Sequence, residues 1–208
     1  MVKFSFPDRF FVTGTDTGVG KTVVCALLAA GLKTHYWKPV QSGSVDGLDS
    51  ETVRTLSGLG PSMIVPEAYV FQKPVSPHLA AEMEGVRIDF EQLNLLNKPE
   101  DLIIEGAGGL MVPLCENVLI LDLIDKLALP VLIVARNTLG TINHTLLTVE
   151  TLKNADLDIM GVVLNGVRND AHVKTIEHFG KVPVLAQLEP FSHFSPTALK
   201  DRFHELFL

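Results

Sequence analysis

Cysteine is scarce in this chain, with 2 in 208 residues, Cys25 and Cys115. Two cysteines this far apart form no metal-ligand motif, and they exclude the disulfide framework of a small secreted domain. Residues 1–9 lack the apolar core and the cleavage site of a signal peptide. We therefore expect two unpaired thiols in the reducing environment of the cytoplasm.

Runs of basic residues and long apolar stretches are also missing. The formal net charge is −7 and Lys and Arg form no cluster, which argues against a surface for nucleic acid or anionic membrane. The apolar stretch around residue 120 is broken by Asp122, Asp125 and Lys126, so it is too short to cross a bilayer. We expect neither nucleic-acid nor membrane partners.

Apolar residues are plentiful, at 47%, and short apolar runs alternate with helical stretches. Several runs are almost wholly apolar, as in strands covered on both faces. Strands are predicted at residues 9–13, 34–37, 101–105, 130–135, 159–164 and 182–186. Helices are predicted at residues 20–32, 49–58, 76–84, 89–97, 118–128, 141–154, 170–179 and 196–207, with loops at 39–48, 58–77 and 106–116. This alternation predicts one α/β domain over residues 1–208, with a doubly wound, mostly parallel sheet that binds ligands at the carboxyl ends of its strands.

The most informative segment is residues 10–22, which run from an apolar strand through Gly-Thr-Asp-Thr-Gly-Val-Gly to Lys21 and Thr22. Glycines let the backbone N–H groups of such a loop approach a polyphosphate. Lys21 supplies charge for the β- and γ-phosphates, and Thr22 offers a hydroxyl to Mg²⁺. The usual pattern has a glycine six residues before the lysine, but this chain has Thr15 at that position and Gly14 one residue earlier. The segment predicts nucleotide binding by a fold of the P-loop NTPase type.

Two acidic residues are candidate metal ligands. Glu105 ends the third predicted strand and precedes Gly-Ala-Gly-Gly. It resembles a Walker B carboxylate with Glu in place of Asp, although an acidic strand end before a flexible turn is the simpler alternative. Asp49 opens a predicted helix, either as a further ligand or as a residue that interacts with the helix dipole. The spacing alone does not choose between these roles.

Three further segments end at the same predicted edge of the sheet. Lys38 closes the second predicted strand. It could neutralise the charge of a transferring phosphoryl group, or it could be a solvated surface residue before a turn. The helix start at residues 140–143 offers free backbone N–H groups to an anion, and Asn143 could add a side-chain donor. The simpler alternative is that Thr141 only caps the helix. Asn165 ends a strand where a nucleotide base could lie, and His78 is better explained as a helix-start residue than as a catalytic one.

Five motifs in this order resemble dethiobiotin synthetase, the ATP-dependent enzyme of biotin biosynthesis. They are the phosphate loop at residues 14–22, Lys-Pro-Val-Gln-Ser-Gly at 38–43, Ser-Pro-His at 76–78, Glu-Gly-Ala-Gly-Gly at 105–109 and Leu-Gly-Thr-Ile-Asn-His at 139–144. The resemblance covers roughly residues 9–190. It implies a cytoplasmic homodimer, with substrate near the subunit interface, that uses ATP and Mg²⁺ to close the ring of dethiobiotin from 7,8-diaminononanoate and CO₂.

The resemblance also implies roles for individual residues. Lys21 and Lys38 stabilise phosphoryl and carbamate charge; Thr22, Asp49 and Glu105 bind Mg²⁺; and Thr17, Ser42 and Asn143 contact the substrate. Nucleotide contacts are implied for Gly18, Val19, Gly20, Lys21, Thr22, Val23, Glu105, Gly106, Ala107, Gly108, Asn165, Leu188, Glu189 and Pro190. One departure is Gly166, where many members carry an Asp that helps to read adenine, and this puts a strict preference for ATP in doubt.

Two other classes share parts of this pattern. A ParA/MinD-like ATPase switch has the same fold and a similar loop, but it usually carries a signature Lys five residues before the loop Lys, where this chain has Asp16. A glutamine-dependent amidating enzyme of the cobyrinic-acid type needs a glutaminase domain with a Cys nucleophile, for which 208 residues leave no room.

Overall fold

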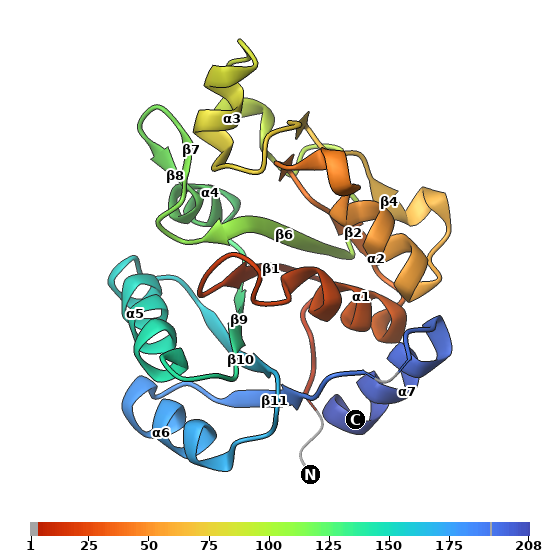
Figure 1. The fold of residues 1–208 in the computed structure, drawn as a ribbon, viewed down its shortest axis with the longest axis vertical. Helices are drawn as coiled ribbons and strands as arrows, with labels where there is room; N and C mark the ends of the chain where they lie inside the picture. The colour runs from red at the N-terminus through yellow and green to blue at the C-terminus, as the bar shows by residue number, and fades with distance from the viewer. Residues whose placement is uncertain (1–3, 192) are drawn as a thin grey trace.

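The computed structural model describes residues 4–191 and 193–208. Its centre is a seven-stranded sheet in the order β11-β10-β9-β1-β6-β2-β4, and every strand pairing in it is parallel. The strands are β1 Arg9–Gly14, β2 His35–Trp37, β4 Ile64–Val65, β6 Leu102–Gly109, β9 Val131–Arg136, β10 Ile159–Asn165 and β11 Val184–Leu188 (Figure 1). The prediction of a doubly wound parallel sheet is confirmed, and all six predicted strands are present.

The structure differs from the predicted strands in two places. β4 lies inside the segment predicted as a loop, because two residues are too few to show a strand pattern, and it adds an edge to the sheet beside β2. β6 continues four residues past Glu105, to Gly109. Its pairing with β1 is irregular there, because residues 105–109 of β6 lie opposite only Val12–Gly14 of β1. Glycines tolerate such a bulge.

Seven α-helices connect the strands in the described chain. They are α1 Lys21–Leu32, α2 Asp49–Ser57, α3 Pro77–Met83, α4 Ile120–Leu127, α5 Thr141–Asn154, α6 Asp170–Gly180 and α7 Pro196–Phe207. The predicted helix at 89–97 is wrong, since only a 3₁₀ turn, Phe90–Gln92, forms there. Asp89 accepts from the Glu91 amide, and Asn94 donates to the Glu91 carbonyl. Local side-chain bonds of this kind compete with helix hydrogen bonds.

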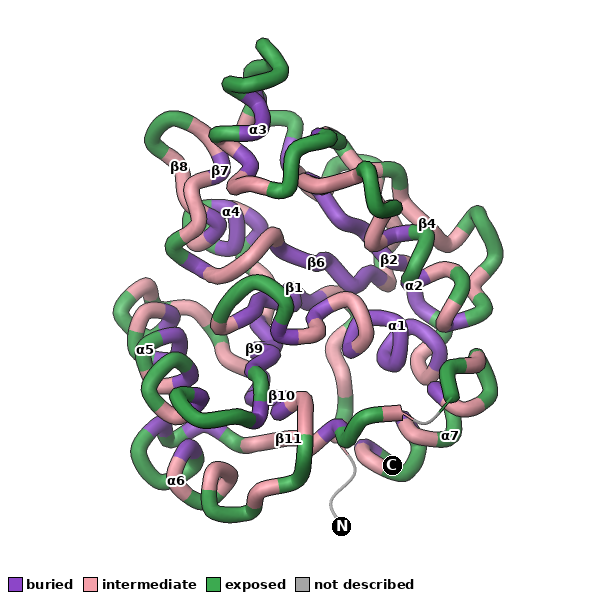
Figure 2. The backbone as a smooth tube through the Cα atoms, in the orientation of Figure 1, coloured by how far each residue is buried: buried purple, intermediate pink, exposed green. Residues whose placement is uncertain are grey.

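Helices cover both faces of the sheet and bury its apolar side chains. One core includes residues of α1, α2 and α7, and the other includes residues of α3, α4, α5 and α6. Side chains alternate between them along each strand: Phe10 and Val12 belong to the first core, and Phe11 to the second. The residues of β1, the first five residues of β6 and the middle of α1 are accordingly mostly buried (Figure 2).

Short strands and free thiols complete the fold. β3 Val40–Gln41 pairs with β5 Tyr69–Val70, and β7 Pro113–Cys115 forms a hairpin with β8 Val118–Leu119. Because β8 occupies residues 118 and 119, α4 begins two residues after the predicted start of the helix at 118–128. Both cysteines are free, as predicted. No helix in the described ranges is long and apolar enough to cross a membrane.

The order of the strands fixes where a ligand can bind. After β1 the chain places β2, β4 and β6 on one side of it, and β9, β10 and β11 on the other. A parallel sheet opens a crevice at such a reversal, beyond the carboxyl ends of its strands. The end of β1 therefore lies at the crevice, and residues 15–20 follow it there.

Candidate active site

The phosphate loop joins β1 to α1 at this crevice. Gly20 has φ 97°, which turns the chain into α1, and in the described structure no side chain caps that helix. Its first N–H groups are therefore available to an anion. Lys21 is 6% exposed, and its Nζ donates to the carbonyl oxygen of Asp16 at 3.1 Å. Burial lowers the pKa of Lys21, against the attraction of Glu105.

Asn165, at the end of β10, lies directly on this loop. Its amide donates to the carbonyl oxygen of Val19 at 2.9 Å. A Cβ atom at Gly20 would lie 2.1 Å from the Asn165 amide nitrogen, so only glycine permits this approach. The predicted base-contact residue thus helps to hold the loop.

Glu105 is the centre of the polar cluster beside the loop. Its side chain is 1% exposed. Oε1 accepts from the Thr22 hydroxyl at 3.0 Å and from Lys38 Nζ at 2.9 Å, and Oε2 accepts from the Tyr36 hydroxyl at 2.8 Å. A buried carboxylate needs partners of this kind on both oxygens. Thr22 of α1 and Lys38, which follows β2, therefore meet at the carboxylate of Glu105 in β6.

Lys38 joins the two predicted carboxylates. Its Nζ donates to Asp49 as well as to Glu105. Burial alone lowers the pKa of Lys38, but the charges of Glu105 and Asp49 outweigh it and hold the pKa above its ordinary value. Lys38 is therefore a permanent cation at neutral pH. Asp49 is itself held by Gln41, whose Oε1 accepts from the Asp49 amide at 3.2 Å.

A cavity of about 690 Å³ connects the loop, this cluster and the turn after β3. Twelve predicted site residues line it: Thr17, Gly18, Gly20, Lys21, Thr22, Val23, Lys38, Ser42, Asp49, Glu105, Ala107 and Gly108. Ser42 has a buried Oγ with no hydrogen-bond partner in the described structure. A buried hydroxyl without a partner is costly, and a ligand in this cavity is positioned to supply one.

The other predicted residues lie outside the lining of that cavity. Val19 and Leu188 are buried in the core, and Gly106 and Asn165 lie beside the cavity. Glu189 and Pro190 are exposed beyond β11, and Asn143 is exposed on the first turn of α5. A cavity that this chain forms alone therefore brings together the predicted phosphate, metal and cation residues, but not the base loop or the predicted carboxylate contact.

Two residues of the cluster, Tyr36 and Gln41, were not predicted from the sequence. Both are buried and polar, and both bond to a predicted carboxylate residue. For Tyr36 the available signal was the two-residue period of extended backbone, because Tyr36 of β2 stands two residues before Lys38. Burial, followed by the charge of Glu105, raises the pKa of Tyr36 well above its ordinary value, so its hydroxyl stays protonated and donates.

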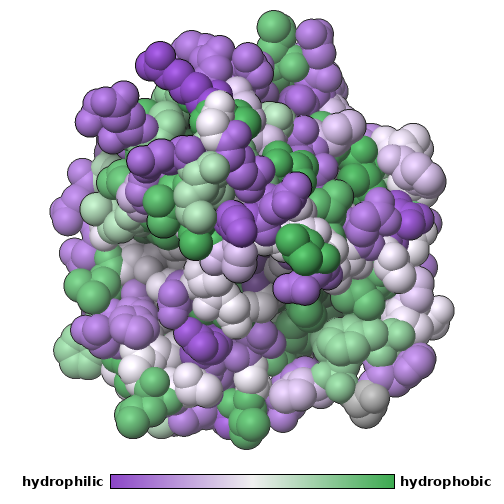
Figure 3. Space-filling view, turned by 45° about the horizontal axis from the view of Figure 1, so that its top comes forward, coloured by the Kyte–Doolittle hydropathy of each residue, from purple (hydrophilic) through white to green (hydrophobic). Residues whose placement is uncertain are grey.

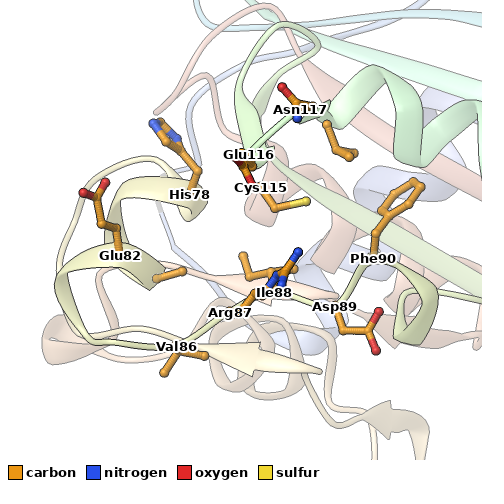
Figure 4. A pocket seen from close by; sticks show the side chains of 12 residues that line it. His78, Glu82, Val86, Arg87, Ile88, Asp89, Phe90, Cys115, Glu116 and Asn117 are labelled. Carbon is orange, nitrogen blue, oxygen red and sulfur yellow. The ribbon is translucent and has the colours of Figure 1, made fainter.

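A larger cavity, of about 1080 Å³, lies between α3 and the β7–β8 hairpin. In Figure 4, His78 and Glu82 lie on the left of this cavity, Phe90 on the right, and Cys115 between them. None of the predicted site residues lines it in the described chain. His78 Nδ1 is 3.0 Å from the Ser76 hydroxyl, a contact at the helix start as expected.

The fold and the loop together define the class: this is an α/β protein with the P-loop NTPase fold. Solved structures agree at the level of fold. A ParA-family ATPase from Chlorobium tepidum aligns over 98% of this chain and 90% of its own, with a TM-score of 0.57 and 14% identity. The MinD cell division protein of Aquifex aeolicus aligns over 95% of both chains, with a TM-score of 0.53 and 15% identity. Identities this low show the fold alone.

Sequence relatives define the family. Residues 8–198 match a family described as an AAA domain. The ATP-dependent dethiobiotin synthetase BioD of Paramagnetospirillum magneticum is 49% identical over 86% of this chain and 87% of its own, and that of Nitrobacter hamburgensis is 44% identical over 96% and 94%. The chain belongs to the dethiobiotin synthetase family. It also matches, at 49% identity, 39% of the length of a bifunctional BioCD protein of Bordetella avium.

Proposed function

We propose that this protein is an ATP- and Mg²⁺-dependent enzyme that converts 7,8-diaminononanoate and CO₂ to dethiobiotin, with release of ADP and phosphate. The observation that carries the proposal is the meeting of Lys21, Thr22, Lys38, Asp49 and Glu105 around one cavity at the phosphate loop. The relatives named dethiobiotin synthetase support it.

The proposed reaction needs no protein nucleophile. One amine of the substrate adds to CO₂ and loses a proton, which gives a carbamate. A carbamate oxygen then attacks the γ-phosphorus of ATP and displaces ADP, forming a carbamic–phosphoric anhydride. The second amine attacks the carbonyl carbon, loses a proton and expels phosphate, which closes the cyclic urea. Catalysis of this kind consists of positioning and charge neutralisation.

Charge neutralisation is the task of the two lysines. Lys21 lies within the loop, so we assign it to the phosphates of the bound nucleotide. Lys38 also lines the cavity and follows β2, which is separated from β1 by β6. We assign Lys38 to the carbamate and the transferring phosphoryl group. The free hydroxyl of Ser42 is assigned to the carbamylated substrate. In a buried site such fixed charges stabilise developing negative charge without solvent reorganisation.

The residues beside the loop fit a magnesium ion. The Thr22 hydroxyl and the carboxylates of Asp49 and Glu105 are oxygen ligands, which Mg²⁺ prefers, and the ion usually takes its other ligands from phosphate and water. These residues line the same cavity as the phosphate loop, so a metal held there would be shared with a bound nucleotide. When bound, the ion would neutralise β- and γ-phosphate charge.

The homodimer is also part of the proposal. A second opening, of about 330 Å³, lies between the phosphate loop and α5, and Met111 and Leu147 line it. These side chains are 63% and 59% exposed, and Leu139 beside the start of α5 is fully exposed. On the face drawn in Figure 3, polar and apolar residues are interspersed. Burial of large apolar side chains favours association. Because Asn143 lies outside the cavity of its own chain, we assign its carboxylate contact to a neighbouring copy.

The decisive experiment is an assay with purified protein, 7,8-diaminononanoate, bicarbonate and Mg-ATP. We expect dethiobiotin and phosphate in equal amounts, and phosphate release that depends on both diamine and bicarbonate. DNA and lipid vesicles should not change the rate. Steady ATP hydrolysis without the diamine, stimulated by lipid or DNA, would instead favour the ParA/MinD-like switch. A cytoplasmic location stays a prediction.

A further inference from the structure

A buried tyrosine contacts the proposed metal carboxylate from behind the cavity. Tyr36 is fully buried, and its hydroxyl donates to Glu105 Oε2 at 2.8 Å. We propose that Tyr36 is a positioning residue, which fixes the Glu105 carboxylate so that Oε1 faces the bound metal and phosphates. The inference rests on the proposed magnesium role of Glu105 and extends it to a residue outside the cavity.

Strand geometry explains how Tyr36 reaches this carboxylate. β2 and β6 are neighbours in parallel register, with Tyr36 opposite Ile103 and Trp37 opposite Ile104. Successive side chains of a strand point to opposite faces. Tyr36 accordingly lies in the core with α1, and Trp37 in the core on the other face. Lys38, one residue past the end of β2, reaches the same carboxylate as Tyr36.

The two oxygens of Glu105 have different surroundings. Thr22 and Lys38, which donate to Oε1, line the cavity and are accessible to a ligand. Tyr36, which donates to Oε2, is not among the residues that line it in the described chain. A nucleotide or metal can therefore change the partners of Oε1, while the Tyr36 bond stays in place. Tyr36 is the fixed contact that limits rotation of the carboxylate.

The core alone gives no reason for a hydroxyl at this position. Tyr36 packs with apolar residues such as Val12, Leu28 and Ile103, where phenylalanine would pack equally well. Burying a hydroxyl is unfavourable unless it is hydrogen-bonded, and in the described structure the Tyr36 hydroxyl donates to Glu105. Outer hydrogen bonds to a ligating carboxylate typically change metal affinity or activity by about 10–100-fold.

Tyr36→Phe removes only the hydroxyl, and the chain offers a matched control. Its other tyrosine, Tyr69, accepts from the Asp89 amide at 2.9 Å, away from the site. With ADP bound, Mg²⁺ is titrated by calorimetry. We expect Tyr36→Phe to raise the half-saturating Mg²⁺ concentration about tenfold or more, and Tyr69→Phe to leave it unchanged. ADP affinity measured in EDTA should be the same for Tyr36→Phe and the parent.

A second pair of variants separates this inference from the proposed function. Glu105→Gln should itself shift the Mg²⁺ titration, and adding Tyr36→Phe to it should produce no further shift, because the hydroxyl acts through the carboxylate. If Glu105→Gln shifts the titration and a folded Tyr36→Phe does not, the role of Tyr36 is wrong. If Glu105→Gln leaves the titration unchanged, the metal role of Glu105 fails and this inference fails with it.

A spectroscopic test covers the case in which Tyr36→Phe does not fold. In the Tyr69→Phe background, 3-fluorotyrosine labels position 36 alone and keeps its hydroxyl. We expect the ¹⁹F resonance of the ADP-bound protein to move when Mg²⁺ is added, because the metal withdraws charge from Glu105. A resonance that does not move while Mg²⁺ binds would overturn the inference.

Discussion

Lys38 shows how a single residue gains a function from its surroundings. By itself a lysine before a proline turn is an ordinary surface residue, but here it is buried between the carboxylates of Glu105 and Asp49. The pKa of Lys38 lies above its ordinary value, so its charge does not titrate in the working range. The activity attributed to it should therefore not show a pH limit from loss of its proton.

The two lysines should respond differently to truncation. Lys38→Ala should lower turnover by about 10²–10³, the scale for one preorganised charge, and should change ATP affinity less. Lys21→Ala should impair both nucleotide binding and turnover, because its side chain lies within the phosphate loop. Steady-state kinetics and ATP binding by calorimetry measure the two effects. Lys33→Ala, at the far end of α1, is the control, and turnover of Lys38→Ala near the parent rate would contradict the assignment.

Some residues of the polar cluster around Glu105 were predictable from the sequence and others were not, for a physical reason. Lys38 and Asp49 could be assigned to one edge because parallel strands bring their carboxyl ends together. Tyr36 could not, because it sits inside an apolar strand and its partner depends on the β2–β6 pairing. Ser42 was expected at the site, and its buried, unpartnered hydroxyl lies in the cavity.

The thiols provide a residue-level test of burial. Cys25 is fully buried and Cys115 is partly exposed. Burial raises the pKa of both, so less thiolate is present at a given pH than for a free cysteine, and the reaction is slower. We expect Ellman's reagent at pH 8 to modify one thiol per native chain, with a rate that keeps rising at higher pH, and two after unfolding. Cys115→Ser should abolish the native reaction, and rapid modification of two native thiols would contradict the buried position of Cys25.

At the scale of elements, short segments were hardest to predict. Long helices such as α5 and α7 agree with the predicted ranges, because apolar spacing over three turns is a strong signal. The segment at 89–97 had such spacing but forms only a turn, since Asp89 and Asn94 bond to nearby backbone. β4 has only two residues, and its place depends entirely on β2.

The start of α2 depends on a side chain from another element. Leu48 precedes the helix and provides no side-chain cap, and Gln41 of β3 accepts from the Asp49 amide instead. Gln41→Ala should destabilise the protein by about 1 kcal/mol, as for a lost cap, and lower turnover about tenfold through Asp49. Denaturant unfolding and steady-state kinetics test both effects. Gln72→Ala, at an exposed position, is the control, and full activity of Gln41→Ala would show that Asp49 needs no such support.

For the whole molecule, a shared fold does not imply a shared function. The ParA and MinD structures share the fold at 14–15% identity, and position 16, where a ParA/MinD-like switch is expected to carry a lysine, holds an aspartate. Asp16 forms an ion pair with Arg136 of β9, at 2.8 Å. The part of the site contributed by the sheet was therefore predictable, whereas the contacts proposed for a second copy and for residues beyond β11 would depend on assembly and ligand.

The backbone conformation at position 166 explains why a glycine stands there, which the sequence did not reveal. Its φ is 139°, which side chains rarely adopt, and its amide donates to the Leu188 carbonyl oxygen at 2.8 Å. Replacing it by Asp would cost about 1–3 kcal/mol of strain unless the turn rearranged. Gly166→Asp is therefore a poor test of base recognition, because strain and base contact would change together. The choice of nucleotide must be tested on the parent enzyme.

We predict modest discrimination among nucleoside triphosphates. Without an acidic acceptor at position 166, adenine loses one contact, which is worth about 1–3 kcal/mol. Asn165 uses its amide nitrogen on the loop carbonyl and retains an oxygen acceptor and a second N–H, so it accommodates more than one base. GTP or CTP should support turnover within about tenfold to a hundredfold of ATP, as competition assays with the four triphosphates would measure. Strict dependence on ATP would contradict this and would mean that the segment at residues 188–190, beyond β11, reads the base when the nucleotide is bound.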